Sequence, residues 1–486
     1  MPDPLDPYNA KQKRPVQKRS YEDRHDGPSH AVESKPGLAS RKAAGLVLTR
    51  VIDDRRGLDG LLDGANALGD VMRLSPPDRS LVRAIVTSAL RHRGEIQAAL
   101  AQQFDRPPPK NARHLIHTLH VAAAQILYLD VPDSAAVNLA VTQIASDQRS
   151  KRFKALANAV LRGLVRHKEA GPLVFKEPPS RLNTPDWFFK RLRTAYGKDK
   201  ALAIGEAHLL EPVIDLQVKA DPKNWAQRLG GGHLFGNTVR VNQRGDVTQW
   251  EGYAEGAWWV QDAAAALPVN LLGSLAGQTV CDLCAAPGGK TAQMVNAGGM
   301  VTALEISDNR RKRLAQNMDR LGFDVDIVAG DLLTWEPPDQ FDAVLLDAPC
   351  SSTGTIRRHP DVAWTKDADT ILELAALQKS MVLRAANYVK PGGVLVFANC
   401  SIDRAEGEDV YNQIVKLGSE GTGLIPDPIS ADDVYGMDEL VTGQHTLRSL
   451  PIHGRAFETP DASSPSEAGR FKGLDGFFAG RFRKVR

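Results

Sequence analysis

The sequence predicts a multidomain protein in which an all-helical domain precedes a small α+β segment and a larger α/β domain. From Ser40 to about Lys168, apolar residues recur at three- and four-residue spacing, and no strand-like alternation interrupts them. From about Trp258 onward, short apolar strands alternate with helices, which is typical of a parallel sheet with helices on both faces. The expected division is a tail at 1–37, a helical domain at 38–170, a connecting α+β domain at 171–257 and an α/β domain at 258–486.

Composition narrows the class of protein. At 486 residues the chain is long enough for two or three domains, and its 61 Lys and Arg against 58 Asp and Glu leave a net charge of only +3. This balance excludes a wholly basic nucleic-acid coat and allows a local basic face. Four cysteines indicate a reducing compartment rather than a disulfide scaffold. No run of about 18 apolar residues occurs, and 1–37 lacks the apolar core of a signal peptide, so we expect a cytoplasmic protein without a membrane segment.

The first 37 residues are rich in Pro, Lys, Arg, Asp and Ser and have almost no large apolar side chains, which predicts disorder. Two interpretations fit their basic cluster: contact with RNA phosphates, or a solubilising tail. The cluster consists of Lys11, Lys13, Arg14, Lys18 and Arg19.

In the helical domain, Pro76-Pro77-Asp78 fits a helix start, and Asp133 or Ser134 is placed to cap a later helix. The stretches 128–138 (YLDVPDSAAVN) and 153–162 (FKALANAVLR) resemble the NusB-like RNA-binding fold. The resemblance implies a module that docks RNA or protein. Alternatively, Asn138, Asn158 and Arg162 simply tie helices together.

The connecting segment begins with a proline-containing linker at 171–185, followed by a helix with Trp187 on its packed face. Alternating stretches at 214–218 and 238–242 predict two strands separated by glycines. Arg240 and Asn242, on the second strand, either contact RNA or lie on the strand surface.

The α/β domain is organised around the stretch 280–291 (VCDLCAAPGGKT). It reads as a buried strand to Leu283, a loop of small residues to Gly289, and a helix that starts near Thr291. Small residues let a ligand approach the backbone closely, and a helix start beside them favours a nucleotide-type site. The spacing matches neither G-x-G-x-x-G nor the phosphate-binding P-loop.

Three acids fall at the carboxyl ends of successive predicted strands: Glu305, Asp331 and Asp347. Ligands bind at this edge of open α/β sheets. Glu305 is placed to hold ribose hydroxyls and Asp331 to read an adenine amino group, although either acid could instead cap the following helix. Because no triphosphate loop is present, the pattern favours an adenosyl ligand without phosphates, S-adenosylmethionine.

Three motifs then carry a family resemblance. Residues 282–291, 347–354 (DAPCSSTG) and 399–402 (NCSI) are similar to the signature motifs of Rossmann-like RNA 5-methylcytosine methyltransferases. With the NusB-like domain in front, the chain resembles the bacterial 16S rRNA cytosine-C5 methyltransferases of the RsmB (Fmu/Sun) type. Residues 354–361 and 475–479 look like that family as well.

The resemblance implies a site. Cys400 would be the nucleophile that adds to cytosine C6, Cys350 would assist product release, Asp347 would hold the cytosine edge, and Lys290 would assist there. Arg357, Arg358 and His359 fit phosphate contacts, against the alternative of a solvated loop. The implied cofactor site comprises Cys284, Ala285, Ala286, Pro287, Gly288, Gly289, Lys290, Glu305, Asp331 and Asp347.

Other interpretations stay open. Cys281-x-x-Cys284 superficially suggests a metal or redox pair, but no second ligand pair exists and Cys281 lies inside a strand, so we expect no metal. The family commonly has Thr before the nucleophile and Glu-Asn a few residues later, where this chain has Asn399 and Glu406-Gly407. The expected partner is 16S rRNA. The alternatives are the same chemistry on tRNA or another RNA, and an RNA-binding assembly or antitermination factor with an inactive methyltransferase half.

Overall fold

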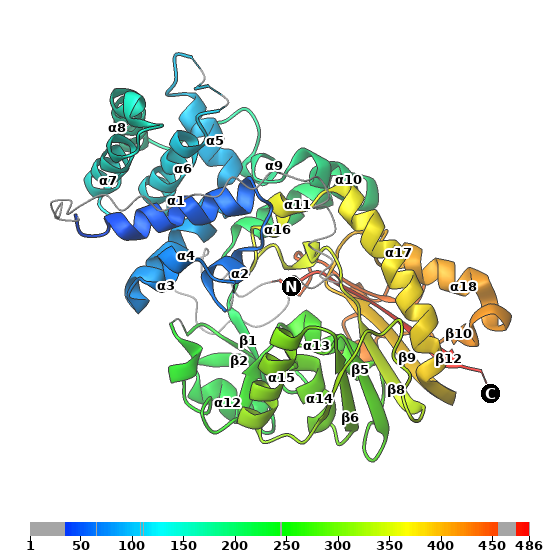
Figure 1. Cartoon of the computed structure of the whole chain (residues 1–486). Coiled ribbons are helices and arrows are strands. Elements are labelled where there is room, and N and C mark those ends of the chain that lie inside the picture. Colours follow the sequence, from blue (N-terminus) through cyan, green and yellow to red (C-terminus); the bar gives the residue numbers. More distant parts are fainter. Residues whose placement is uncertain are drawn as a thin grey trace, which may run out of the picture. The chain divides into compact units, whose positions relative to one another are not determined.

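The computed structural model describes residues 35–64, 66–106, 108–109, 111–243, 245–454 and 473–485. The predicted disordered tail therefore lies, apart from its last three residues, outside the described part of the chain. From Gly37 onward the described residues belong to one compact unit. It contains an all-helical domain, a small α+β segment and an α/β domain, so the predicted fold class is confirmed (Figure 1).

The helical domain is built around one apolar core to which most of its helices contribute. Ser75 caps α4 by accepting a hydrogen bond from the Asp78 backbone N–H, as the proline pair at its start predicts. The capping prediction for Asp133 or Ser134 is wrong: α7 begins at Asp133 without a side-chain cap, and Asp133 forms an ion pair with Lys168. The helices are α1 (Leu38–Ile52), α2 (Leu58–Leu62), α3 (Gly69–Met72), α4 (Pro76–Arg91), α5 (Arg93–Ala101), α6 (Arg113–Tyr128), α7 (Asp133–Ser146) and α8 (Lys154–Ala170).

The described residues of the connecting segment form four α-helices and a four-stranded antiparallel sheet in the order β2-β3-β1-β4. The last strand starts at Trp258, so the predicted boundary at 257/258 falls inside this sheet. The elements are α9 (Pro179–Leu182), α10 (Asp186–Tyr196), α11 (Lys198–Leu209), β1 (Ile214–Val218), α12 (Pro222–Arg228), β2 (Gly231–Phe235), β3 (Thr238–Val241) and β4 (Trp258–Val260).

Neither interpretation of Arg240 fits the structure. Its side chain is buried and forms a two-pronged ion pair with Asp215, with Nε–Oδ1 and Nη2–Oδ2 distances of 2.7 and 2.8 Å. A third bond, from Nη1, reaches the Gly473 carbonyl. Because a guanidinium can be buried only when it is paired, Arg240 ties β1 to β3 and is not a surface residue. Asn242 is exposed.

The α/β domain has a mixed sheet in the order β10-β12-β9-β8-β5-β6-β7, with β11 paired to β12. The strands β9, β8, β5, β6 and β7 pair in parallel with their neighbours. In contrast, β12 pairs antiparallel with β9, and both β10 and β11 pair antiparallel with β12. The predicted repetition of βα units missed this, because an antiparallel strand needs no crossover helix. The strands are β5 (Thr279–Leu283), β6 (Met300–Glu305), β7 (Asp326–Ala329), β8 (Phe341–Asp347), β9 (Val389–Asn399), β10 (Leu424–Pro426), β11 (Leu447–Ser449) and β12 (Phe477–Lys484).

Helices cover both faces of this sheet. Val394, Val396 and Ala398 of β9 face a core shared with α13 and α14, whereas Leu395 and Phe397 face a core shared with α17 and α18. This alternation buries the strand on both sides and fixes its register. The helices are α13 (Ala263–Asn270), α14 (Gly289–Asn296), α15 (Asp308–Leu321), α16 (Val362–Thr365), α17 (Ala368–Ala385) and α18 (Glu408–Thr422).

Candidate active site

The carboxyl edge of the parallel strands brings the predicted residues together. β6 ends at Glu305 and β8 ends at Asp347, while β9 ends at Asn399, one residue before Cys400. Cys350 follows β8 after two residues. Since β8 and β9 are neighbours in the sheet, the two loops that carry the cysteines start side by side.

The two cysteine sulfurs lie 3.4 Å apart, within hydrogen-bonding distance. Ser352 Oγ is 3.5 Å from the Cys400 sulfur. The pKa of Cys400 is lowered, chiefly because the Cys350 thiol hydrogen-bonds to its sulfur, and the positive charge of Lys290 acts in the same direction. The pKa of Cys350 is raised by the same hydrogen bond and by burial. Cys400 is therefore the sulfur that ionises more readily, and the thiolate is the reactive form of a cysteine.

Lys290 stands beside this pair at the first turn of α14. Its Nζ donates a hydrogen bond to Asp347 Oδ2 over 2.7 Å and lies 4.8 Å from the ring centroid of Phe477. The Asp347 side chain keeps 30% exposure, whereas Lys290 keeps 11%. The ammonium thus places a positive charge near the Cys400 sulfur and orients a carboxylate that a bound base can still reach.

The loop between β5 and α14 has the backbone path that small residues permit. Ala285 donates its N–H to the Leu304 carbonyl, which joins the loop to β6. Gly288 has φ of +104°, and a Cβ there would lie 2.5 Å from Leu314 Cδ1, so this position requires glycine. Arg310 donates to the Ala286 carbonyl over 2.6 Å and so ties the loop to α15.

Glu305 and Asp331 differ in what their carboxylates already bind. Glu305 is buried; its Oε1 accepts the Ser307 N–H, while its Oε2 accepts no hydrogen bond from any described residue. Arg310 Nη2 is 3.5 Å from that Oε2. Asp331 Oδ1 accepts the Leu333 N–H within a turn. The residues between β7 and β8 are all described and form no helix, so the capping alternative for Asp331 is wrong. Glu305 thus has an oxygen available to a ligand hydroxyl.

Asp282 is a site residue to which the sequence analysis gave no role of its own. It is fully buried in β5, and its Oδ2 accepts a hydrogen bond from Thr291 Oγ1 over 2.6 Å. Oδ1 has no hydrogen-bond partner among the described residues. Burial raises the pKa of Asp282 to about 7. An acid inside an apolar strand was the signal that could have identified it.

The three predicted RNA contacts are all held by carboxylates. Arg357 is buried against Asp475, so in this structure its guanidinium is not exposed to a phosphate. Arg358 also pairs with Asp475 and keeps 36% side-chain exposure. His359 Nδ1 lies 3.1 Å from Asp59 of the helical domain. Of the three, Arg358 and His359 keep exposed side-chain surface, 36% and 37%.

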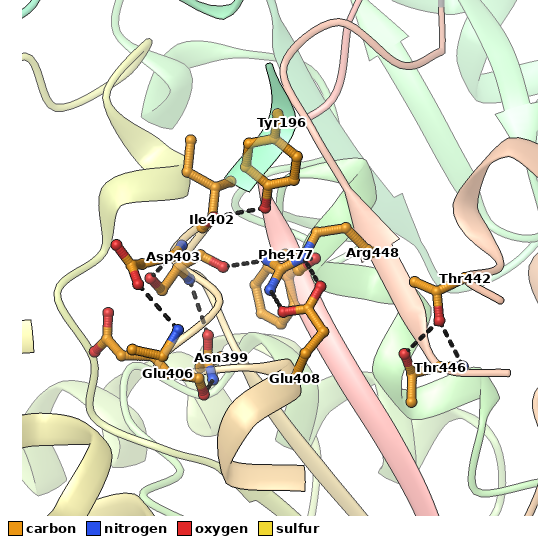
Figure 2. A network of polar contacts seen from close by, with 12 residues as sticks. Tyr196, Asn399, Ile402, Asp403, Glu406, Glu408, Thr442, Thr446, Arg448 and Phe477 are labelled. Atoms are coloured by element: carbon orange, nitrogen blue, oxygen red, sulfur yellow. Dashed lines mark hydrogen bonds and ion pairs between the residues drawn. The ribbon is translucent and has the colours of Figure 1, made fainter. Parts of the chain in front are cut away.

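A buried carboxylate supports both cysteine loops from behind. Glu406 is fully buried, and it accepts hydrogen bonds from the Ser351 N–H (2.8 Å), the Ser351 hydroxyl and Gln378 (3.1 Å). Asn399 donates to the Glu406 carbonyl over 2.8 Å and accepts the Ser401 N–H over 3.0 Å. The asparagine that departs from the family pattern therefore closes the turn around Cys400 (Figure 2).

A second buried group holds the far side of the Cys400 loop. Arg448 and Glu408 form a buried two-pronged ion pair, and Arg448 also donates to the Ser401 carbonyl. Figure 2 shows Arg448 between Glu408 and the turn that carries Ile402. Arg448 lies in the stretch 412–472, in which no motif can be recognised, so the sequence alone gave no signal for it.

Two absences concern the described residues only. In that part of the chain, no helix is long and apolar enough to span a membrane. Nor do three or more His, Cys, Asp or Glu side chains there gather in a group that could hold a metal ion.

Comparison with known proteins gives consistent matches. A family model described as 16S rRNA methyltransferase RsmB/F matches residues 269–451, and the NusB family model matches residues 38–166. Ribosomal RNA small subunit methyltransferase B of Vibrio vulnificus is 32% identical over 422 residues, which cover 81% of this chain and 97% of the relative. The protein of the same name from Vibrio cholerae is 33% identical over 383 residues, covering 75% and 86%.

Among solved structures, the crystal structure of PH0851 aligns with a TM-score of 0.68 at 21% identity. The alignment covers 93% of this chain and 99% of that chain. The likeness thus extends over all the domains described above and concerns the fold.

Proposed function

Since the chain belongs to the RsmB/F family of 16S rRNA methyltransferases, we propose that it methylates carbon 5 of a cytosine in 16S rRNA through a transient bond between Cys400 and C6. The coarser class is an S-adenosylmethionine-dependent RNA methyltransferase. The observation that carries the finer proposal is the pair of sulfurs 3.4 Å apart, next to the Lys290–Asp347 pair. A single nucleophile would not require a second thiol in contact with it.

The residues at the sheet edge fit S-adenosylmethionine, which supplies a methyl group on a positively charged sulfur. Glu305 has a buried oxygen that accepts no hydrogen bond from any described residue, which supports its binding of ribose hydroxyls. The small side chains of 284–289 leave the loop backbone open to the ligand. Asp331 would lie at the adenine end, and Lys290 and Asp347 at the methyl end, next to the cysteines.

Cys400 would start the reaction, because C5 of cytosine is too weak a nucleophile by itself. Its thiolate forms a bond to C6, and the electron pair of the C5–C6 double bond becomes available at C5. Asp347, exposed beside Lys290, would hydrogen-bond the cytosine edge and stabilise protonated N3. The base must leave its stack to reach this position, and unstacking costs a few kcal/mol.

Cys350 would act after methyl transfer, when C5 carries both a proton and the new methyl group. Removal of that proton lets the C5–C6 double bond re-form and expels the Cys400 thiolate. The contact between the sulfurs supports this role, because Cys350 would then lie beside the bond that must break, and its raised pKa favours its protonated form while Cys400 is the thiolate.

The test uses Cys350→Ala and Cys400→Ala variants with S-adenosylmethionine and either a 16S rRNA fragment or tRNA. Cys281→Ala is the matched control, because that thiol is buried within β5 and is not part of the contact between Cys350 and Cys400. An RNA–protein adduct that survives denaturation is measured by gel, and methylcytosine by mass spectrometry.

We expect Cys350→Ala to accumulate the adduct, Cys400→Ala to form neither adduct nor product, and the control to behave like the wild type. A reversed pattern would exchange the two roles. Methylation of tRNA alone would assign the other RNA substrate. Absence of methyl transfer by the wild type on either RNA would favour a binding factor with an inactive methyltransferase half.

A further inference from the structure

The segment 353–367 joins the Cys350 loop to α17 and forms one wall of the cysteine site. At its start, the Gly354 N–H donates to the Cys400 carbonyl over 2.9 Å, and Thr353 Oγ1 accepts the Ile402 N–H over 3.2 Å. A Cβ on Gly354 would lie 1.9 Å from the Gly476 carbonyl oxygen, so the two backbones are in direct contact. The segment thus fixes where the Cys400 loop lies relative to Cys350.

The other side of this segment is held by the helical domain. Asp361 is buried, and its Oδ2 accepts the Leu58 N–H at the start of α2 over 3.0 Å. Trp364 of α16 donates its indole N–H to the Leu90 carbonyl near the end of α4 over 2.9 Å. Figure 1 shows α16 next to α1 and α2, and α1 and α16 are in contact.

Charged side chains extend the same contact. Arg91 donates to the Arg357 carbonyl over 2.7 Å, which fixes the backbone in the middle of the segment. The Arg93 guanidinium lies 5.5 Å from the Trp364 ring centroid. Arg55 pairs with Asp367 at the start of α17, although this pair is exposed and contributes little.

A second path runs from the helical domain through the connecting helices. Asn183 accepts the N–H groups of Gly94 and Glu95 at the first turn of α5, so it joins that helix to α9. From α10, Tyr196 donates its hydroxyl to the Ile402 carbonyl over 2.6 Å, next to Cys400 (Figure 2). Arg191 of the same helix donates hydrogen bonds to the Asp403 carboxylate from Nε and Nη2.

We propose that the helical domain is a positioning part of the catalytic centre: through Asp361 and Trp364 it holds the 353–367 segment so that Cys350 and Cys400 stay in contact. A domain that only docked RNA would have no reason to bury its backbone N–H and C=O groups against a catalytic loop. The inference rests on the proposed function for its kinetic effect. The positioning of the sulfurs does not depend on it.

Asp361→Ala removes the acceptor of the Leu58 N–H, and Asp361→Asn restores one. Trp364→Phe removes the indole donor and keeps an aromatic ring under Arg93. Arg73→Ala, which in the described part of the chain breaks an exposed pair with Asp70 of the same domain, is the matched control. Two quantities are measured on the full chain: alkylation of Cys350 by iodoacetamide without RNA, and kcat and KM for methylation of a short cytosine RNA that reaches only the active site.

For Asp361→Ala and Trp364→Phe we expect the rate of Cys350 alkylation to rise and kcat to fall, each about ten-fold. This is the effect expected when one buried hydrogen bond to a loop that must stay ordered is lost. KM should change by less than about two-fold, and Asp361→Asn should restore both values, because a pure docking loss would act on KM alone. Unchanged alkylation in both variants, or a rise in KM without a fall in kcat, would overturn the proposal. If even the wild type methylates no RNA, the proposed function fails, and the alkylation rates still decide the positioning.

Discussion

Asp282→Asn should change the pH dependence of stability, because this carboxyl group is fully buried and only one of its oxygens has a hydrogen-bond partner in the described part of the chain. The folded pKa is raised from 3.8 to about 7, so between these values the unfolded chain is ionised while the folded protein still holds the proton. Unfolding then releases a proton, and the free energy of unfolding falls by about 1.4 kcal/mol per pH unit. The contribution of the Asp282 carboxyl to the free energy of unfolding is fully present below pH 4. Above pH 7 this free energy is lower by about 4 kcal/mol.

Asparagine cannot ionise and keeps an oxygen for the Thr291 hydroxyl, so the variant lacks this slope. Urea unfolding at half-unit steps from pH 5 to pH 8, compared with the wild type, measures the difference profile. Asp339→Asn is the control, because Asp339 is exposed. The variant should gain stability relative to the wild type as pH rises to 7 and then hold a constant difference. Parallel profiles for Asp282→Asn and the wild type would refute the argument that burial holds the proton on this group.

Three further outcomes follow from the site. Gly354→Ala should abolish the RNA adduct, since its Cβ would lie 1.9 Å from the Gly476 carbonyl oxygen and 2.7 Å from the Cys400 carbonyl oxygen. Gly443→Ala is the control and should form the adduct normally, because its Cβ would meet no described atom within 4 Å. Adduct formation by both variants would contradict the close approach of the backbones at Gly354. Glu408→Gln should lower the free energy of unfolding by about 3–5 kcal/mol because it leaves Arg448 buried without its carboxylate. In chemical denaturation, Glu336→Gln at an exposed pair should cost less than about 1 kcal/mol, and equal losses would count against burial as the cause. Iodoacetamide between pH 7 and pH 8 should label Cys400 before Cys350, because the pKa of Cys400 is lowered and that of Cys350 is raised; peptide mass spectrometry showing Cys350 labelled first would reverse the assignment.

The parts of the molecule that depend on local pattern could be predicted from the sequence. The strand, small-residue loop and helix at 280–291 correspond to β5 and α14, and the acids at 305 and 347 end strands as expected. These features depend on neighbours along the chain, so spacing and residue type suffice to find them. The helical domain was equally visible, since its apolar stripes define its core.

Contacts between distant segments could not be predicted in this way. Arg357 fits a phosphate-binding loop by sequence, yet Asp475, far along the chain, pairs with it in the interior. The sequence left Arg240 as an RNA contact or a strand-surface residue, whereas the fold pairs it with Asp215 in the interior. The antiparallel direction of β12 depends on its pairing with the edge of β9. Local periodicity does not encode that pairing. In each case the missing information was the identity of a partner remote in sequence.

The departures from the family pattern around Cys400 are explained by such partners. A side chain at Gly407 would place its Cβ 2.4 Å from Arg448 Nη2 and 2.8 Å from Phe478 Cγ, so the position cannot hold asparagine while Arg448 is packed there. Arg448 in turn needs Glu408 as its counter-charge and holds the Ser401 carbonyl. Asn399 closes the same turn from the other side through the Glu406 carbonyl. The turn that presents Cys400 is therefore fixed by a buried ion pair and an amide bridge together, and this chain can differ from the common motif while the proposed nucleophile stays held in place.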